Sequence, residues 1–167
     1  IVLCVSDEEA EFVDRLAPGR EIILVAATVD PPERIVARGD RRGMVFLGGF
    51  MSGDDAPNAD TVQYLADDVL PAVWAREPAV TLDVLGADPT HAVSARRGDR
   101  ITVGGPVVDP VQALGRYLVK LAPVRFGSGI KLKFLDAMAA GTPFVTTPVG
   151  AEGLHLGSLT DVLVGTT

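Results

Sequence analysis

Short apolar runs alternate along the chain with stretches whose apolar residues recur at helical spacing. The apolar runs fall at 1–5, 21–27, 44–48, 81–85, 101–103, 117–122, 144–146 and 162–164. The helical stretches between them fall at 7–16, 58–76, 89–96, 110–114 and 130–140. Continuous apolar runs are typical of strands buried on both faces, and strands that alternate with helices across short loops favour parallel pairing. The pattern predicts an α/β fold, with a parallel sheet and helices on both of its faces.

Polar residues at the ends of these stretches indicate where the helices begin. Ser6, followed by Glu9, fits the capping box S-x-x-E for the helix over 7–16. Asn58 and Asp109 are the expected N-cap residues of the helices over 58–76 and 110–114. We expect Pro71 to kink the long helix near its end, because proline lacks the main-chain donor that a helix needs.

The composition changes between residues 29 and 43, where adjacent prolines are interleaved with arginines and acids and little periodicity remains. Such a stretch is typical of a linker. We therefore divide the chain into residues 1–30, a linker over 31–43, and a larger domain over 44–167. The chain begins inside an apolar run without an initiator methionine and ends just after another run, so we expect it to be a fragment of a longer protein.

Charge and composition exclude several classes of partner. The net charge is −7, from 15 basic and 22 acidic residues, and only 5% of the residues are aromatic. A nucleic-acid surface needs basic patches and stacking rings, so nucleic acid is not an expected partner. A single cysteine, Cys4, cannot form an internal disulfide, which fits a reducing compartment. No apolar run approaches the roughly 18 residues that a membrane helix needs.

A glycine-rich segment follows the apolar run at 117–122 and leads into the helix expected over 130–140. It carries Arg125, Gly127, Gly129, Lys131 and Lys133. Cations in the first turn of a helix are disfavoured by about 0.3–1 kcal/mol each, which an anion held by main-chain N–H groups and lysines would explain. Alternatively, the lysines extend into solvent and the glycines only turn the chain. The residues alone leave both interpretations open.

Further candidate ligand-binding positions follow other predicted strands, at the sheet edge where parallel sheets bind ligands. Gly48 and Gly49 form a turn after the run at 44–48, and the loop over 146–153 is rich in hydroxyls and glycine. Asp136, inside a predicted helix, is either a solvated residue or a carboxylate aimed at a ligand hydroxyl. The pattern alone favours an ordinary turn at 146–153 and a solvated Asp136.

Several familiar site motifs are missing from the sequence. There is no Asp-x-Asp pair, and His91 and His155 are isolated, so no metal site is expected. The sequence holds neither G-x-x-x-x-G-K-[ST] nor G-x-S-x-G. Gly127 and Gly129 lack the third glycine of the dinucleotide fingerprint, so this partial match carries little weight.

The run over 122–145, APVRFGSGIKLKFLDAMAAGTPFV, resembles the donor-binding core of GT-B glycosyltransferases of the retaining group 1 kind. TPVGAEG at 147–153 and VFLGGF at 45–50, with Asn58 and Asp60 after it, continue the resemblance. It covers residues 44–167 and implies a Rossmann-like domain that binds a nucleotide-sugar donor. Residues 1–30 resemble the end of the acceptor-side domain of the family.

The resemblance implies donor-binding and catalytic roles for individual residues. The family often has Glu-x₇-Glu here, and its second Glu, which binds ribose, falls on Asp136. The first Glu, which contacts the donor sugar, falls on Ser128, so the identity of the sugar does not carry over. No basic residue occurs in 49–60 to meet the diphosphate, and Lys131, with Arg125, is expected to stabilise the leaving diphosphate instead. The expected donor-binding residues are Gly48, Gly49, Gly127, Ser128, Gly129, Ile130, Asp136, Thr147, Val149, Gly150 and Glu152.

The resemblance implies a bacterial, cytoplasmic glycosyltransferase that moves a hexose from a nucleoside diphosphate sugar to an unknown acceptor with retention, without a metal or other cofactor. A peripheral position on the inner membrane face is an alternative location, with membrane contact only through parts outside this chain. The acceptor, whether a saccharide, a lipid-linked molecule or another compound, is expected to bind mainly to the missing domain. We therefore expect this fragment alone to be inactive. A nucleotide-sugar epimerase of the same fold and a non-catalytic nucleotide-binding module remain as alternatives.

Overall fold

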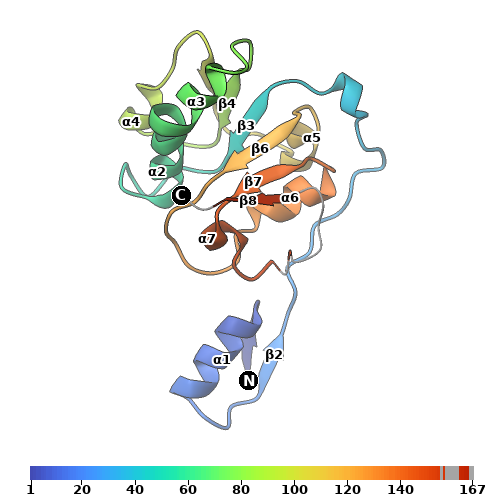
Figure 1. The fold of residues 1–167 in the computed structure, drawn as a ribbon. Helices are drawn as coiled ribbons and strands as arrows, with labels where there is room; N and C mark the ends of the chain where they lie inside the picture. The colour runs from blue at the N-terminus through green and yellow to red at the C-terminus, as the bar shows by residue number, and fades with distance from the viewer. Residues whose placement is uncertain (155, 157–161, 166–167) are drawn as a thin grey trace.

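The computed structural model describes residues 1–154, 156 and 162–165, and a parallel six-stranded sheet forms its centre (Figure 1). The strand order is β5-β4-β3-β6-β7-β8, and all neighbouring pairs are parallel. The strands are β3 (Met44–Leu47), β4 (Leu82–Leu85), β5 (Ile101–Val103), β6 (Val119–Ala122), β7 (Phe144–Thr146) and β8 (Val162–Val164). The predicted α/β fold with a parallel sheet is confirmed. The strand order reverses between β3 and β6, which is where such sheets open a crevice for a ligand.

Two separate hydrophobic cores cover the two faces of this sheet. Successive residues of a strand point to opposite faces, so Phe46 of β3 enters one core and Val45 and Leu47 enter the other. In the first core Phe46 lies 5.9 Å from Phe50 between ring centroids. In the second core α6 (Lys133–Ala139) packs on the sheet through Phe134, which is fully buried.

The helices of the first core include α2 (Pro57–Tyr64), a π-helical turn (Leu65–Val69), α3 (Leu70–Trp74) and α4 (His91–Ser94). The predicted helix over 58–76 is therefore interrupted. Pro71 explains this, because its ring would clash with the carbonyl four residues earlier in a regular helix, and the wider π turn precedes it. Asn58 is not the N-cap: Ala56 occupies that position and no side chain caps the helix.

The second face carries α5 (Pro110–Leu114) and α6, and α7 (Pro148–Ala151) follows β7. Asp109 caps α5 as predicted, with Oδ1 accepting from the Gln112 N–H at 2.9 Å. The helix predicted over 130–140 begins later, at Lys133. The reason lies in the preceding segment, because Gly127 and Gly129 adopt positive φ angles of 132° and 73° and keep the chain out of a helical path.

Residues 1–24, which we call the N-terminal unit, form β1 (Val2–Cys4), α1 (Asp7–Leu16) and β2 (Ile22–Leu24), with β1 and β2 parallel. Figure 1 shows this unit in blue, apart from the large sheet. Ser6 caps α1 as predicted, its Oγ accepting from the Glu9 N–H at 3.1 Å. The second half of the expected capping box differs, because Glu9 Oε2 accepts from the N–H of Val5, at 3.0 Å, one residue before the cap.

The linker reaches the sheet domain, defined as the described residues from 44 onward, through one buried arginine. Arg41 is 7% exposed, and its guanidinium donates to the carbonyls of Val36, Ala140 and Gly141, and to Thr142 Oγ1. Main-chain carbonyls at the end of α6 thereby gain a partner, and the end of the linker is fixed to the sheet domain. A 3₁₀ turn over Arg38–Asp40 leads into this contact.

Candidate functional site

The loops that follow β3 and β6 lie at the point where the strand order reverses. The Gly48 N–H donates to the carbonyl of Leu85 at 3.0 Å, which ties the loop after β3 to the end of β4. A Cβ on Gly86 would overlap the carbonyl oxygen of Gly48, so the two loops touch backbone to backbone. The predicted Gly48–Gly49 turn is therefore held closely at the carboxyl edge of the sheet.

Asn58 connects this turn to the segment after β6. Its Nδ2 donates to the carbonyl of Gly49 at 2.7 Å, and its Oδ1 accepts from Lys133 Nζ at 2.6 Å. Lys133 Nζ also lies 5.4 Å from the centroid of the Phe46 ring. Burial, together with the charge of neighbouring Lys131, lowers the pKa of Lys133 to about 8.

Lys131 precedes α6 and pairs across the carboxyl edge with Glu152. Its Nζ lies 3.1 Å from Glu152 Oε2, and the side chains are 9% and 47% exposed. The expectation that Lys131 lies in the first turn of a helix is wrong, because α6 begins two residues later. The carbonyl of Lys131 instead accepts from the Phe134 N–H at 3.0 Å, in a tight turn that leads into the helix.

Lys120, on β6, is a buried cation that the sequence analysis missed. It is fully buried, its Nζ donates to the carbonyl of Lys133, and it lies 5.5 Å from the centroid of the Phe134 ring. Burial, followed by the charge of Lys133, lowers the pKa of Lys120 to about 7. The chain contains three lysines, and the structure brings all of them to this one region. A lysine inside an apolar strand run was the available signal.

Asp136 lies half-buried on α6. Burial raises the pKa of its carboxyl group, Lys120 opposes that shift, and Asp109 adds to it. Asp136 is not among the residues that line the two cavities described below. Its predicted contact with ribose stays a prediction.

Arg125 faces α2 rather than Lys131. Its Nε donates to Asp60 Oδ2 at 3.0 Å, its Nη2 donates to Oδ1 of the same carboxylate, and its guanidinium lies 4.9 Å from the centroid of the Tyr64 ring. The hydrogen bond to Asp60 raises the pKa of Arg125. A role of Arg125 at the diphosphate also stays a prediction.

The segment after β7 contains a short helix, α7, where a loop was expected. Thr147 caps it: its Oγ1 accepts from the Gly150 N–H at 3.2 Å and donates to the carbonyl of Val124. A Cβ on Gly150 would overlap Thr146 Oγ1, so this position needs glycine. Val149 is half-buried. Thr147 and Gly150 thus have a structural reason to be present, whatever they contact in a ligand.

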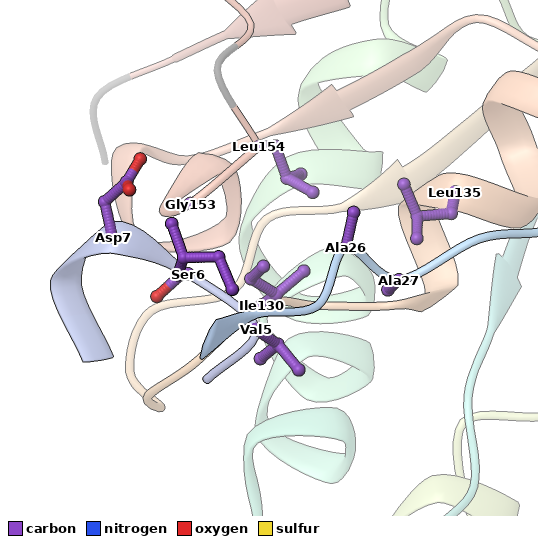
Figure 2. Close-up of a pocket in the computed structure, with 10 residues that line it drawn as sticks. Val5, Ser6, Asp7, Ala26, Ala27, Ile130, Leu135, Gly153 and Leu154 are labelled. Carbon is purple, nitrogen blue, oxygen red and sulfur yellow. The ribbon is translucent and has the colours of Figure 1, made fainter. Parts of the chain in front are cut away.

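Two cavities lie between the N-terminal unit and the sheet domain. The first, of about 240 Å³, is mostly apolar; Figure 2 shows Val5 and Ser6 of the N-terminal unit close to Ile130 of the sheet domain, with Leu135 and Leu154 farther along the cavity. The second, of about 310 Å³, contains more charged groups. Its lining residues are Ser6, Glu8, Glu9, Phe12, Arg15, Ser128, Gly129, Ile130, Glu152 and Gly153. Four predicted donor-binding residues, Ser128, Gly129, Ile130 and Glu152, therefore share one cavity.

Two general findings concern only residues 1–154, 156 and 162–165. Within these ranges, no three His, Cys, Asp or Glu side chains are grouped so that they could hold a metal ion. In the same ranges, every helix is too short or too polar to cross a bilayer. His91 is the first residue of α4, and His155 lies outside the described residues.

The fold is similar to that of solved structures that include glycosyltransferases. TarM of S. aureus matches with a TM-score of 0.70 and 12% identity, over 99% of this chain and 34% of TarM. The pneumococcal O-GlcNAc transferase GtfA matches with a TM-score of 0.71 and 14% identity, over 99% of this chain and 34% of GtfA. HepE of Anabaena matches with a TM-score of 0.68 and 13% identity, over 99% of this chain and 49% of HepE. The chain thus spans about a third to a half of these proteins, and it has the Rossmann-like fold of one GT-B half.

The sequence itself gives a family match. No curated protein matches this sequence. The family model described as "Glycosyl transferases group 1" matches residues 41–165, which include the whole described part of the sheet domain. This range covers both glycine-containing turns and all three lysines of the chain. The chain therefore belongs to the group 1 family of glycosyl transferases.

Proposed function

We propose that this chain is the donor-binding half of an enzyme that moves a hexose from a nucleoside diphosphate sugar to an acceptor, with retention of configuration. The observation that carries the proposal is the position of Lys131 and Lys133 in the segment after β6, with Lys133 linked through Asn58 to the turn after β3, in a chain of net charge −7. Concentrated positive charge at this edge suits a diphosphate. The structures of GtfA with UDP and GlcNAc and of HepE with UDP and glucose support this donor class.

In this proposal the Lys131 ammonium stabilises negative charge as the nucleoside diphosphate leaves. Such stabilisation by fixed cations needs no metal, and none is invoked. Glu152 is the counterion of Lys131 before the donor binds, and their 3.1 Å pair holds the ammonium at the edge of the cavity. Asp136 accepts hydrogen bonds from ribose, and the 147–153 segment lines the sugar and phosphate.

The acceptor lies on the side of the N-terminal unit in this proposal. The charged cavity between Glu9 and Ser128 leads there. Residues 1–30 are the end of the acceptor-side domain, residues 31–43 are the linker, and most of the acceptor site belongs to a part of the enzyme outside this chain. The enzyme works in the cytoplasm, and the present chain alone binds the donor without transferring the sugar.

Calorimetric titration of Lys131→Ala and Asp136→Asn with uridine and UDP, and with guanosine and GDP, tests the proposal. Lys131→Ala should weaken diphosphate binding by about 1.5–3 kcal/mol, or roughly ten- to more than a hundredfold, and leave the binding of the bare nucleoside almost unchanged. Asp136→Asn should weaken nucleoside and diphosphate alike, because ribose is common to both. Arg96→Ala is the control, because it removes a cation that pairs with Asp67 on the outer helices.

Three outcomes would contradict the proposal. The first is a parent chain that binds neither UDP nor GDP. The second is a Lys131→Ala variant that binds the diphosphate as well as the parent does. The third is loss of affinity in EDTA that Mg²⁺ or Mn²⁺ restores, because the proposed site uses no metal.

A further inference from the structure

Asn58 and Lys133 form the hydrogen-bonded link between the turn after β3 and the segment after β6. Resting on the proposed function, we propose that Asn58 is a positioning residue for the diphosphate of the donor. Its amide fixes the Gly48–Gly49 turn against the segment after β6 and holds the Lys133 ammonium there without neutralising it. Asn58 itself is not proposed to contact the ligand.

The two ends of the Asn58 amide are both engaged. Nδ2 donates to the Gly49 carbonyl at 2.7 Å, and Oδ1 accepts from Lys133 Nζ at 2.6 Å. Because the amide is planar and short, these two bonds set the separation of the two loops. A Cβ on Gly48 would lie 2.9 Å from Nδ2, so the amide also rests directly against this turn.

The Asn58 side chain is not needed to begin the helix. Ala56 is the N-cap of α2, Pro57 follows it, and no side chain accepts a hydrogen bond from the first turn. Asp60 on the same turn makes a second link to the segment after β6 by pairing with Arg125. The first turn of α2 therefore joins the turn after β3 to the segment after β6, and the Asn58 side chain contacts both.

The choice of an amide rather than a carboxylate matters for charge. Lys133 is half-buried, and the charge of neighbouring Lys131 acts on it. Burying a cation costs free energy that a carboxylate partner would offset. Asn58 provides a hydrogen bond but no negative charge, so the region stays positive. Lys131 pairs with the Glu152 carboxylate, whereas the acceptor on Lys133 Nζ is the neutral Asn58 amide.

Replacing this amide by a carboxylate distinguishes a role of Asn58 in positioning the diphosphate from a role in the stability of the fold alone. Asn58→Asp keeps an acceptor for Lys133, neutralises it, and loses the donor to Gly49. We expect UDP affinity to fall about tenfold, which corresponds to about 1.4 kcal/mol, and uridine affinity to stay within twofold. The melting temperature should change little, because the counterion that a buried cation gains offsets the lost hydrogen bond to the Gly49 carbonyl. A merely structural Asn58 would move the melting temperature and both affinities together.

Gln63→Glu is the matched control. Gln63 lies on the same helix, and its amide donates to the carbonyls of Asp54 and Ala59 at 3.3 Å each. The control makes the same chemical change in the same helix, away from the lysines, so UDP affinity should stay near that of the parent. Equal UDP affinity for Asn58→Asp and Gln63→Glu would overturn the inference.

A measurement without ligand keeps this inference separate from the proposed function. In ¹H–¹⁵N spectra, Asn58→Ala and Lys133→Arg should each shift the amide signals of Gly48 and Gly49, and Gln63→Ala should not. If the parent binds no nucleoside diphosphate, the proposed function fails, and the positioning of a diphosphate fails with it. If the parent binds UDP but the glycine signals do not move, the proposed function stands and the inference about Asn58 fails.

Discussion

The N-terminal unit and the sheet domain both build parallel strands joined by a helix, yet they are held together differently. In the N-terminal unit α1 has no buried residue, and large apolar side chains such as Leu3 and Leu16 are 66% and 70% exposed. In the sheet domain every residue of β3 is buried. The same strand–helix–strand pattern therefore rests mainly on local signals in the N-terminal unit and mainly on packing in the sheet domain.

The first turn of one helix in each region shows what stabilises that region. In α1 the Ser6 hydroxyl caps the first turn, which carries Asp7, Glu8 and Glu9 at the positive end of the helix dipole. In α6 no side chain caps the helix, which begins with a lysine. Packing of its inner face, where Phe134 lies 4.6 Å from Phe144 between ring centroids, stabilises α6 instead.

The largest test of this comparison is a pair of phenylalanine truncations. Phe134→Ala should lower the free energy of unfolding of the sheet domain by about 3–5 kcal/mol, because it opens a cavity in a packed core. Phe12→Ala removes a side chain that is 54% exposed, so it should change the free energy of unfolding by less than about 0.5 kcal/mol. Urea unfolding followed by the fluorescence of Trp74 measures both. Similar losses for the two variants would remove the distinction between the regions.

The second test uses pH, because the buried charge belongs to the sheet domain. Burial lowers the folded-state pKa of Lys120 to about 7, from an ordinary value of 10.5. Between these two pH values the unfolded chain binds more protons than the folded chain, so stability should rise with pH, by at most about 1.4 kcal/mol per unit for one group. Lys133, with a pKa of about 8, acts in the same direction above that pH.

Lys120→Met isolates the contribution of one lysine. Chemical unfolding at pH 7, 8 and 9 should give a flatter profile for this variant than for the parent. A parent whose stability falls over this range would show that Lys120 stays charged at little cost.

The smallest expected effect lies in the N-terminal unit. Ser6→Ala removes the acceptor for the Glu9 N–H and should destabilise α1 by about 1 kcal/mol. Amide hydrogen exchange should become faster along α1 and stay unchanged in β3 and β6. Faster exchange in the sheet domain as well would mean that the two regions unfold together.

The sequence was sufficient for the strands and for most helices because continuous apolar runs and helical spacing alternate clearly and are separated by turn and capping residues. It was insufficient where two signals competed. The apolar spacing of 130–140 predicted a helix from Ile130, but the positive φ angle of Gly129 delays the helix to Lys133. Asn58 looked like a cap, but Ala56 begins α2 and the Asn58 amide turns toward Gly49.

The candidate site was partly predictable for a related reason. Resemblance pointed to the glycine turns and to Lys131, which share the carboxyl edge of the sheet. It did not point to Lys120, since a lysine between apolar residues of a strand looks like an edge position until the strand is seen to be central. It also could not show that Arg125 already has a carboxylate partner, because Asp60 is 65 residues away in the sequence.

The Arg41 contact with the carbonyls at the end of α6 has a mechanical consequence. Since Arg41 also holds the carbonyl of Val36, the last residues of the linker move as part of the sheet domain. Any rotation of the N-terminal unit must then be absorbed by the roughly ten residues between β2 and Ile35, where the structure has neither helix nor strand. Since α1 forms part of the wall of the charged cavity, one buried guanidinium fixes the point from which the chain leaves the sheet domain toward that wall.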